Sequence, residues 1–282
     1  MIVCHDSTRA MRIHHLNCCT MCPAAGSLVN RHGRMVAHCL LIETPSAGLV
    51  LVDTGIGLDD VADLGGRLGS WFVAIAGVRA APQETAARQV EALGFRRDDV
   101  RHIVVTHLDL DHAGGLPDFP SARVHLHARE KHAALARRTI EERRRYRACH
   151  WAHGPAWAPY ETLDGEKWFG FDCVRALEGL PPEILSIPLH GHTRGHTAIA
   201  VDTGSGWLLH AGDGYFSAGT VDPSAEPQRV GLRLFERVAA MNSAQVRANH
   251  ARLRALHMQH RADVTVFSAH DPDEFARLAP KH

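Results

Sequence analysis

Four side chains that are able to hold a metal ion lie within six residues of the sequence. They are His107, Asp109, Asp111 and His112. They follow directly on a β-branched run at 103–106, which is typical of a buried strand. A mixture of imidazole and carboxylate suits Zn, Fe or Mn. Because a catalytic zinc takes about three ligands from the protein, four candidates in one stretch suggest two adjacent metals.

The backbone conformation of this stretch decides which of its side chains point the same way and are able to bind the same metal. In an extended chain the side chains alternate, so residues 107, 109 and 111 would share one face. His112 would then point elsewhere, unless a helix begins there. A surface loop can hold several His and Asp residues by chance, but the position between a buried strand and Ala113-Gly114-Gly115 favours a metal site.

Composition excludes several classes of protein. The chain has 282 residues, of which 45% are hydrophobic, so it is able to bury a large core and is not disordered. Its length allows one large domain or two small ones. Lys+Arg 31 balances Asp+Glu 31, so no basic excess predicts nucleic-acid binding and no polybasic anchor predicts a membrane. No run of eighteen apolar residues is present to span a bilayer.

The seven cysteines argue against a disulfide framework, because their number is odd and their spacing fits no small disulfide-rich domain. Cys19 and Cys22 form Cys-x-x-Cys next to Cys18, which suits half a zinc site or a redox motif. No second Cys-x-x-Cys and no thioredoxin pattern follow, so we interpret them as buried or loop thiols. Residues 1–11, a candidate N-terminal extension, lack the apolar core of a signal peptide. We therefore predict a cytoplasmic protein.

Hydrophobic periodicity predicts the elements that must position the ligands. Strands are expected over 12–18, 36–43, 48–53, 100–105, 122–127, 185–189, 198–202, 207–211 and 264–267. Helical spacing is found over 85–93, 130–147 and 231–257. Four of the strands, ending near residues 105, 189, 211 and 267, each lead into a loop that carries His or Asp. Reactive groups on loops that a rigid sheet fixes in place are typical of enzymes.

Two further segments bear on the site. The strand at 48–53 ends in Asp53-Thr54-Gly55, a motif of aspartic proteases, but these need two such carboxylates and the chain has one. We interpret Asp53 as fixing a loop rather than binding metal. Segment 130–160 is a basic helical run followed by Trp151, Trp157 and Tyr160, and we expect this helical and aromatic insert to contact either the substrate or a second subunit of a homodimer.

With these motifs in order, the chain resembles the metallo-β-lactamase superfamily. The residues that carry the resemblance are the stretch His107 to His112, Gly195-His196, Gly212-Asp213 and Ala269-His270, with Asp53-Thr54-Gly55 upstream. They cover nearly the whole chain. The resemblance implies an α/β fold, a four-layer αββα sandwich, formed as a single domain over 1–282. The metals would lie at one edge, between the two sheets.

The resemblance also implies the ligands of two divalent metal ions. His107, Asp109 and His196 would hold the first metal; Asp111, His112 and His270 would hold the second; Asp213 would bridge both. Most hydrolases of the superfamily have His where this chain has Asp109. A carboxylate there makes Fe or Mn more plausible beside Zn, which remains the first expectation.

The branch that the chain looks most like is the N-acyl-homoserine lactonase-like group, which implies hydrolysis of a small ester or lactone. A metal-activated water would attack the carbonyl carbon. Asp111 or Asp213 would orient this water and pass its proton to the leaving oxygen, and Tyr215 would donate a hydrogen bond to the oxyanion. In those lactonases the Tyr lies three residues after the bridging Asp, whereas Tyr215 lies two after Asp213. The alternatives are a thioester, β-lactam, organophosphate or phosphodiester substrate, or a non-hydrolytic iron-dependent or ligand-binding protein.

Overall fold

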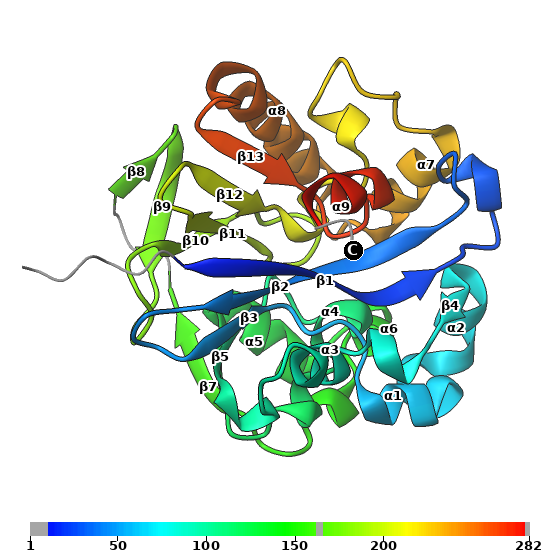
Figure 1. Ribbon diagram of the computed structural model, residues 1–282. Coiled ribbons are helices and arrows are strands. Elements are labelled where there is room, and N and C mark those ends of the chain that lie inside the picture. Colours follow the sequence, from blue (N-terminus) through cyan, green and yellow to red (C-terminus); the bar gives the residue numbers. More distant parts are fainter. Residues whose placement is uncertain (1–10, 162–165, 280–282) are drawn as a thin grey trace, which may run out of the picture.

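The computed structural model describes residues 11–161 and 166–279 (Figure 1). Residues 1–10, most of the expected N-terminal extension, lie outside this description. The first sheet has the strand order β4-β1-β2-β3-β5-β6-β7. Its strands are β1 (Arg12–Met21), β2 (Met35–Glu43), β3 (Leu49–Val52), β4 (Val78–Arg79), β5 (Val100–Val104), β6 (Arg123–His127) and β7 (Ala156–Tyr160). Strands β3, β5, β6 and β7 run parallel, so the loops that follow them leave the same edge of the sheet.

The second sheet has the order β13-β12-β11-β10-β9-β8. Its strands are β8 (Glu166–Trp168), β9 (Phe171–Ala176), β10 (Ile184–Pro188), β11 (Thr197–Asp202), β12 (Trp207–His210) and β13 (Val264–Phe267). Strand β13 pairs parallel to β12, whereas β10, β11 and β12 are antiparallel neighbours. The loops after β10, β12 and β13 carry the downstream ligand candidates.

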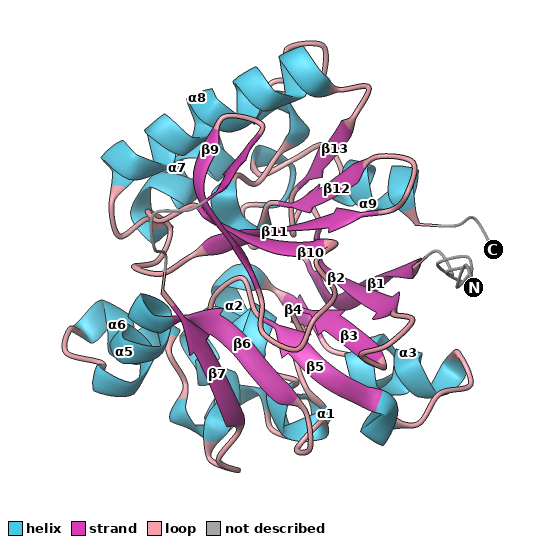
Figure 2. Ribbon diagram, turned by 90° about the vertical axis from the view of Figure 1, so that its left-hand side faces the viewer, coloured by secondary structure: helices cyan, strands magenta, loops and turns pink. Residues whose placement is uncertain are grey.

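The two sheets pack face to face, and helices cover their outer sides (Figures 1 and 2). Leu40, Val52 and Val104 of the first sheet meet Ile199 and Phe267 of the second in one buried cluster. The helices on the side of the first sheet are α1 (Leu58–Ala62), α2 (Ser70–Ala76), α3 (Ala86–Ala92), α4 (Leu110–Ala113), α5 (Ala128–Ala136) and α6 (Ile140–Arg145). Helices α7 (Val230–Ala239) and α8 (Ser243–His260) lie on the side of the second sheet, and α9 (Pro272–Leu278) lies beside β13 and packs against β1 and β2. This arrangement confirms the predicted αββα sandwich.

Two predicted helices are each divided in the structure. The expected helix over 231–257 becomes α7 and α8, because Ala240 is extended and Asn242 caps α8 by accepting from two backbone amides. The helical stretch over 130–147 becomes α5 and α6, because Arg137 adopts a left-handed conformation with φ of 40°. Thr139 and Glu142 then start α6 with a reciprocal capping box. Cap chemistry, rather than periodicity, sets these boundaries.

The interpretation of the N-terminal cysteines agrees with their placement. Cys18 and Cys19 are buried free thiols on β1, and Cys22 is a half-buried free thiol just after this strand. In the part of the chain that the structure describes, no helix is long and apolar enough to cross a membrane.

Candidate metal centre

The stretch that follows β5 bends once, and this bend separates its ligands. Asp109 is still extended, with φ of −68° and ψ of 161°, and it precedes the short helix α4. Asp111 and His112 lie on α4, so their side chains point in other directions than those of His107 and Asp109. The sequence left open whether a helix begins here, and the structure shows that one does.

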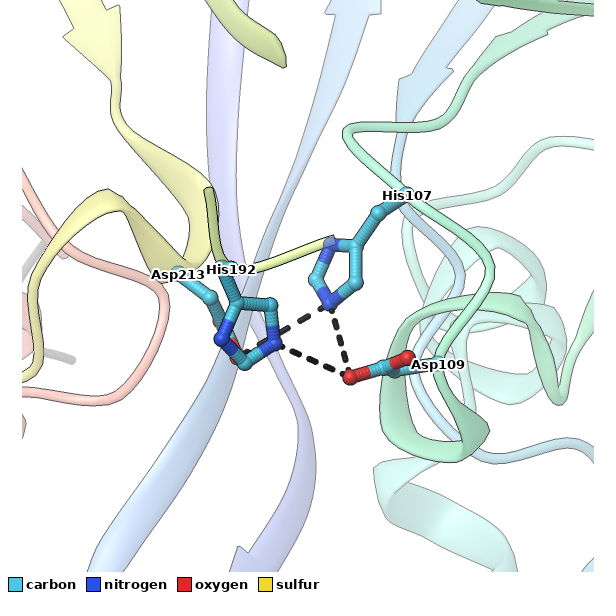
Figure 3. A group of neighbouring side chains, drawn as sticks. All are labelled: His107, Asp109, His192 and Asp213. Atoms are coloured by element: carbon cyan, nitrogen blue, oxygen red, sulfur yellow. Dashed lines mark hydrogen bonds and ion pairs between the residues drawn. The ribbon is translucent and has the colours of Figure 1, made fainter. Parts of the chain in front are cut away.

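Two groups of buried side chains result, and within each group the ligand atoms lie within 4.8 Å of one another. The first group consists of His107, Asp109, His192 and Asp213 (Figure 3). The second group consists of Asp111, His112 and His270. The loops after β5, β10, β12 and β13 supply these residues, so both sheets contribute to the centre.

Asp213 connects the two groups through its two carboxylate oxygens. Its Oδ1 lies 3.1 Å from Nε2 of His112 and 3.0 Å from Nε2 of His270, both in the second group. Its Oδ2 lies 3.1 Å from Nε2 of His192 and 3.7 Å from Nε2 of His107, both in the first group. The bridging role that the resemblance implied for Asp213 stays a prediction, which this position between the two groups favours.

Hydrogen bonds to Nδ1 orient three of these histidines. Nδ1 of His270 donates to the carbonyl of Val36 at 2.7 Å. Nδ1 of His112 lies 2.8 Å from a carboxylate oxygen of Asp53, and Nδ1 of His107 lies 2.9 Å from the hydroxyl of Thr106. An imidazole that donates from Nδ1 keeps its Nε2 lone pair for a metal, and such outer partners are typical of metal ligands.

Asp53 organises this outer layer, as the sequence suggested. Its carboxylate accepts from the backbone amide and the hydroxyl of Thr106, at 2.7 and 2.8 Å, in addition to His112. Its backbone φ of 57° lies in the left-handed region, which is costly for a residue with a side chain. The hydrogen bonds that Asp53 makes to the ligand loop offset this strain.

The structure does not bring His196 into either group, whereas His192, which was not among the predicted ligands, lies in the first group. Both ring nitrogens of His196 have protein partners: Nδ1 donates to the carbonyl of Leu189 at 3.0 Å, and Nε2 accepts from the backbone amide of Asp213 at 3.0 Å. His196 thus orients the Asp213 loop. The signal for His192 was present in the sequence, since the two histidines share one glycine-rich loop, but sequence spacing alone did not distinguish them.

The placement of Tyr215 contradicts its predicted role as an oxyanion donor. Its side chain is buried in the core beneath α8, and its hydroxyl donates to the carboxylate of Glu274 at 2.9 Å. The next residue, Phe216, faces the centre instead, stacked on His270 with 5.2 Å between the ring centroids. The extended backbone at Tyr215 turns these two neighbours in opposite directions.

Tyr215→Phe is therefore expected to act on stability and not on catalysis. Loss of the hydroxyl removes a buried hydrogen bond to a carboxylate, which lowers the free energy of unfolding by about 1–3 kcal/mol. The value of kcat/KM for the folded enzyme stays unchanged. Urea denaturation and steady-state kinetics on the same preparation measure both. A large fall in kcat with unchanged stability would restore Tyr215 to the mechanism.

The charges of the centre favour its binding a cation. Burial would raise the pKa of Asp109, yet Arg145 and the neighbouring His107 hold it well below its usual range. Burial likewise opposes ionisation of Asp213, but surrounding histidines, His270 first, keep its pKa well below the usual range. Both groups are thus carboxylates.

Three buried atoms of the first group make no hydrogen bond. They are Nε2 of His107, Oδ1 of Asp109 and Oδ1 of Asp213. Unpartnered buried donors and acceptors are costly, and a metal ion satisfies such atoms in ligand clusters. The side chains present therefore fit a divalent cation.

A pocket of about 630 Å³ opens above the centre, with Asp109, Asp111, His192, Asp213 and His270 on its floor. Much of its wall is apolar, including Trp71 and Phe72 on α2, Phe216, and Leu232 and Phe235 on α7.

The insert at 130–160 contributes the charged residues Glu141, Arg144 and Arg145 to the wall of this pocket. Its aromatic residues lie elsewhere: Trp151 and Trp157 pack in the core under the first sheet, and Tyr160 contacts Ser186. The insert thus reaches the pocket through charged residues of α6.

Glu130 on α5 ties together the two loops that carry the first group. Its buried carboxylate accepts from the backbone amide of Leu108 at 3.1 Å and from that of Gly195 at 2.9 Å. It also accepts from the hydroxyl of Thr193 at 2.7 Å. One side chain therefore fixes the His107 loop relative to the His192 loop.

Comparison of the sequence with known proteins agrees with this geometry. The profile of the family described as "Metallo-beta-lactamase superfamily" matches residues 32–265. A Mycobacterium tuberculosis protein named "Probable metallo-hydrolase" is 44% identical over 264 residues, which are 93% of this chain and 81% of that protein. An N-acyl homoserine lactonase of Bacillus thuringiensis is 26% identical over 178 residues, which are 63% of this chain and 61% of that protein.

Solved structures share the fold. An N-acyl homoserine lactone hydrolase with the product N-hexanoyl-L-homoserine at its catalytic metal centre matches with a TM-score of 0.67 at 20% identity. That match covers 96% of this chain and 97% of the other. The hydrolase AbOPH matches with a TM-score of 0.60 at 16% identity and covers 95% and 90% of the two chains.

Proposed function

This chain belongs to the metallo-β-lactamase superfamily, and we propose that it hydrolyses a small ester or lactone with the aid of two divalent metal ions. The observation that carries the proposal is the position of Asp213. Its two oxygens face two separate ligand groups, each of which holds enough His and Asp for one cation. Zn is the first expectation, with Fe or Mn as alternatives because three carboxylates are among the ligands.

We assign the ligands from the two groups. His107, Asp109 and His192 would hold the first ion and Asp111, His112 and His270 the second, and Asp213 would offer one carboxylate oxygen to each group. When bound, the ions supply Lewis acidity toward the carbonyl oxygen and lower the pKa of water. Asp213 and Asp111 lie on the pocket floor, where their carboxylates orient the attacking water and carry its proton to the leaving oxygen. Tyr215 takes no part in this step.

The pocket supports the class of substrate. Its apolar wall, formed in part by Trp71, Phe72 and Phe235, suits an uncharged ester or lactone with an apolar chain. The lactonase of Bacillus thuringiensis and the lactone hydrolase structure, among the matches above, act on such molecules by their names. We expect no nucleic-acid partner, because the net charge is zero.

Two further expectations belong to this proposal. The free thiols Cys18, Cys19 and Cys22 are consistent with a reducing compartment, and we expect the enzyme to act in the cytoplasm. The insert at 130–160 is a candidate contact for a second subunit, and sedimentation velocity of the purified protein measures whether it forms a homodimer.

Metal removal tests the proposed function directly. Purified protein is expected to contain about two divalent ions per chain by plasma mass spectrometry. It should hydrolyse a lactone or aryl ester, lose this activity on exhaustive dialysis against a chelator, and regain it with Zn²⁺. The same panel includes a phosphotriester, a thioester and a β-lactam. Preference for one of these would change the substrate class, and undiminished hydrolysis after removal of the metal would refute the proposal.

A further inference from the structure

Arg145 is a buried cation that touches the first ligand group from outside. It is the last residue of α6, and its side chain is 13% exposed. Its Nη1 donates to Oδ2 of Asp109 at 2.8 Å and lies 3.0 Å from Nε2 of His192. Its Nη2 donates to the carbonyl of Ala239, at the end of α7. A guanidinium is costly to bury, so a position with this many partners indicates a specific role.

The ligands explain why a positive charge is needed here. Asp109 and Asp213 both place an oxygen close to Nε2 of His192, at 3.0 and 3.1 Å. Asp111 adds a third carboxylate on the same pocket floor. Arg145 contacts only one oxygen of Asp109 and leaves Oδ1 without a partner. The carboxylate can therefore keep its bond to Arg145 while its other oxygen faces a metal.

We propose that Asp109 and Arg145 form one charge-neutral unit at the metal group, in which Arg145 limits how tightly the first ion is held. This inference rests on the proposed function, because it concerns the same metal centre. Asp109 contributes one negative charge and Arg145 cancels it, so together they act on a cation as an uncharged ligand does. Arg145 is a positioning residue: it acts through Asp109 and fixes the direction of this carboxylate.

Whether metal affinity rises or falls when Arg145 is removed distinguishes this role from a merely structural one. Removal of Arg145 leaves the negative charge of Asp109 uncompensated, so Arg145→Met should bind a divalent cation more tightly, by about tenfold or more. Loss of a contact that only holds the site together would weaken binding instead. Arg145→Lys keeps the charge and should bind the metal close to wild-type affinity, although its single ammonium cannot reach Asp109 and Ala239 at once.

The experiment measures Zn²⁺ affinity at pH 8 by competition with a chromogenic chelator, on wild type, Arg145→Met, Arg145→Lys and a control. The control is Arg143→Met, which removes an exposed arginine of the same helix whose guanidinium donates to the carbonyls of Arg137 and Arg138. Circular dichroism shows that each variant is folded. The proposal predicts tighter binding in Arg145→Met alone.

The outcomes separate this proposal from the one before it. Unchanged or weaker Zn²⁺ binding by folded Arg145→Met overturns the charge-neutral unit and leaves the metal-dependent hydrolase intact. If Arg145→Met does not fold, Arg145→Lys provides the test. A fall in its Zn²⁺ affinity of about tenfold or more, despite the retained charge, overturns the charge-neutral unit. Wild-type protein that binds none of Zn²⁺, Fe²⁺ and Mn²⁺ would overturn both proposals.

Discussion

Asp213→Asn should lower kcat/KM by on the order of 10³-fold, because about 4 kcal/mol of transition-state stabilisation is lost when two ions no longer share a carboxylate. An amide has no negative charge, and only its oxygen is able to ligate. The two histidine pairs that face Oδ1 and Oδ2 then lose their common partner. Metal content should fall below two ions per chain.

The fold should survive this substitution. The backbone amide of Asp213 is held by His196, and this bond does not involve the side chain that changes. The measurements are steady-state kinetics and plasma mass spectrometry, with circular dichroism as the check on folding. Asp263→Asn, a change on the protein surface, is the matched control and should leave metal content and rate unaltered. Wild-type turnover by Asp213→Asn would exclude a bridging role.

Glu130→Ala should lower the free energy of unfolding by about 3–5 kcal/mol, because it leaves buried donors unsatisfied. The amides of Leu108 and Gly195 and the hydroxyl of Thr193 all lose their acceptor. Both ligand loops should then become mobile, so metal affinity falls together with stability. Urea denaturation at a fixed metal concentration measures the first effect, and chelator competition measures the second.

A surface carboxylate provides the matched control for Glu130. Glu91 pairs with Arg88 and Arg97 on the outside of the protein, and Glu91→Ala should cost less than about 1 kcal/mol. Metal affinity should not change in this variant. If Glu130→Ala is no less stable than Glu91→Ala, the two ligand loops are held by other contacts.

Most strands and the neighbouring ligand candidates could be predicted from the sequence because their signals are short-range, whereas β4, β7, β8 and β9 were not predicted. Apolar β-branched runs marked the strands around residues 40, 50, 103 and 266, each within about two residues. His107, Asp109, Asp111 and His112 are close together in the chain, so their types and spacing were sufficient to single them out as candidate ligands, and the structure places them in the two groups. The αββα layers followed from the order of the motifs rather than from the periodicity.

What could not be predicted depends on partners that are distant in sequence. His196 lies outside the two groups, with Leu189 and Asp213 at its ring nitrogens, whereas Nε2 of His192 lies 3.0 Å from Asp109 and 3.1 Å from Asp213. Tyr215 points away from the centre because a buried carboxylate 59 residues later accepts its hydroxyl. Arg145 belongs to the basic run of the insert, and its contact with the carbonyl of Ala239 at the end of α7, 94 residues later, could not be predicted.

The candidate metal ligands come from both sheets, and this affects how the protein unfolds when a metal is bound. The loop after β5 belongs to the first sheet, whereas the loops after β10, β12 and β13 belong to the second. A bound cation therefore cross-links the two halves of the sandwich and must be released before they separate. Metal at one hundred times its dissociation constant would add about 2.7 kcal/mol to the native state. Melting temperatures of different variants will be comparable only in buffers that hold free metal at one concentration.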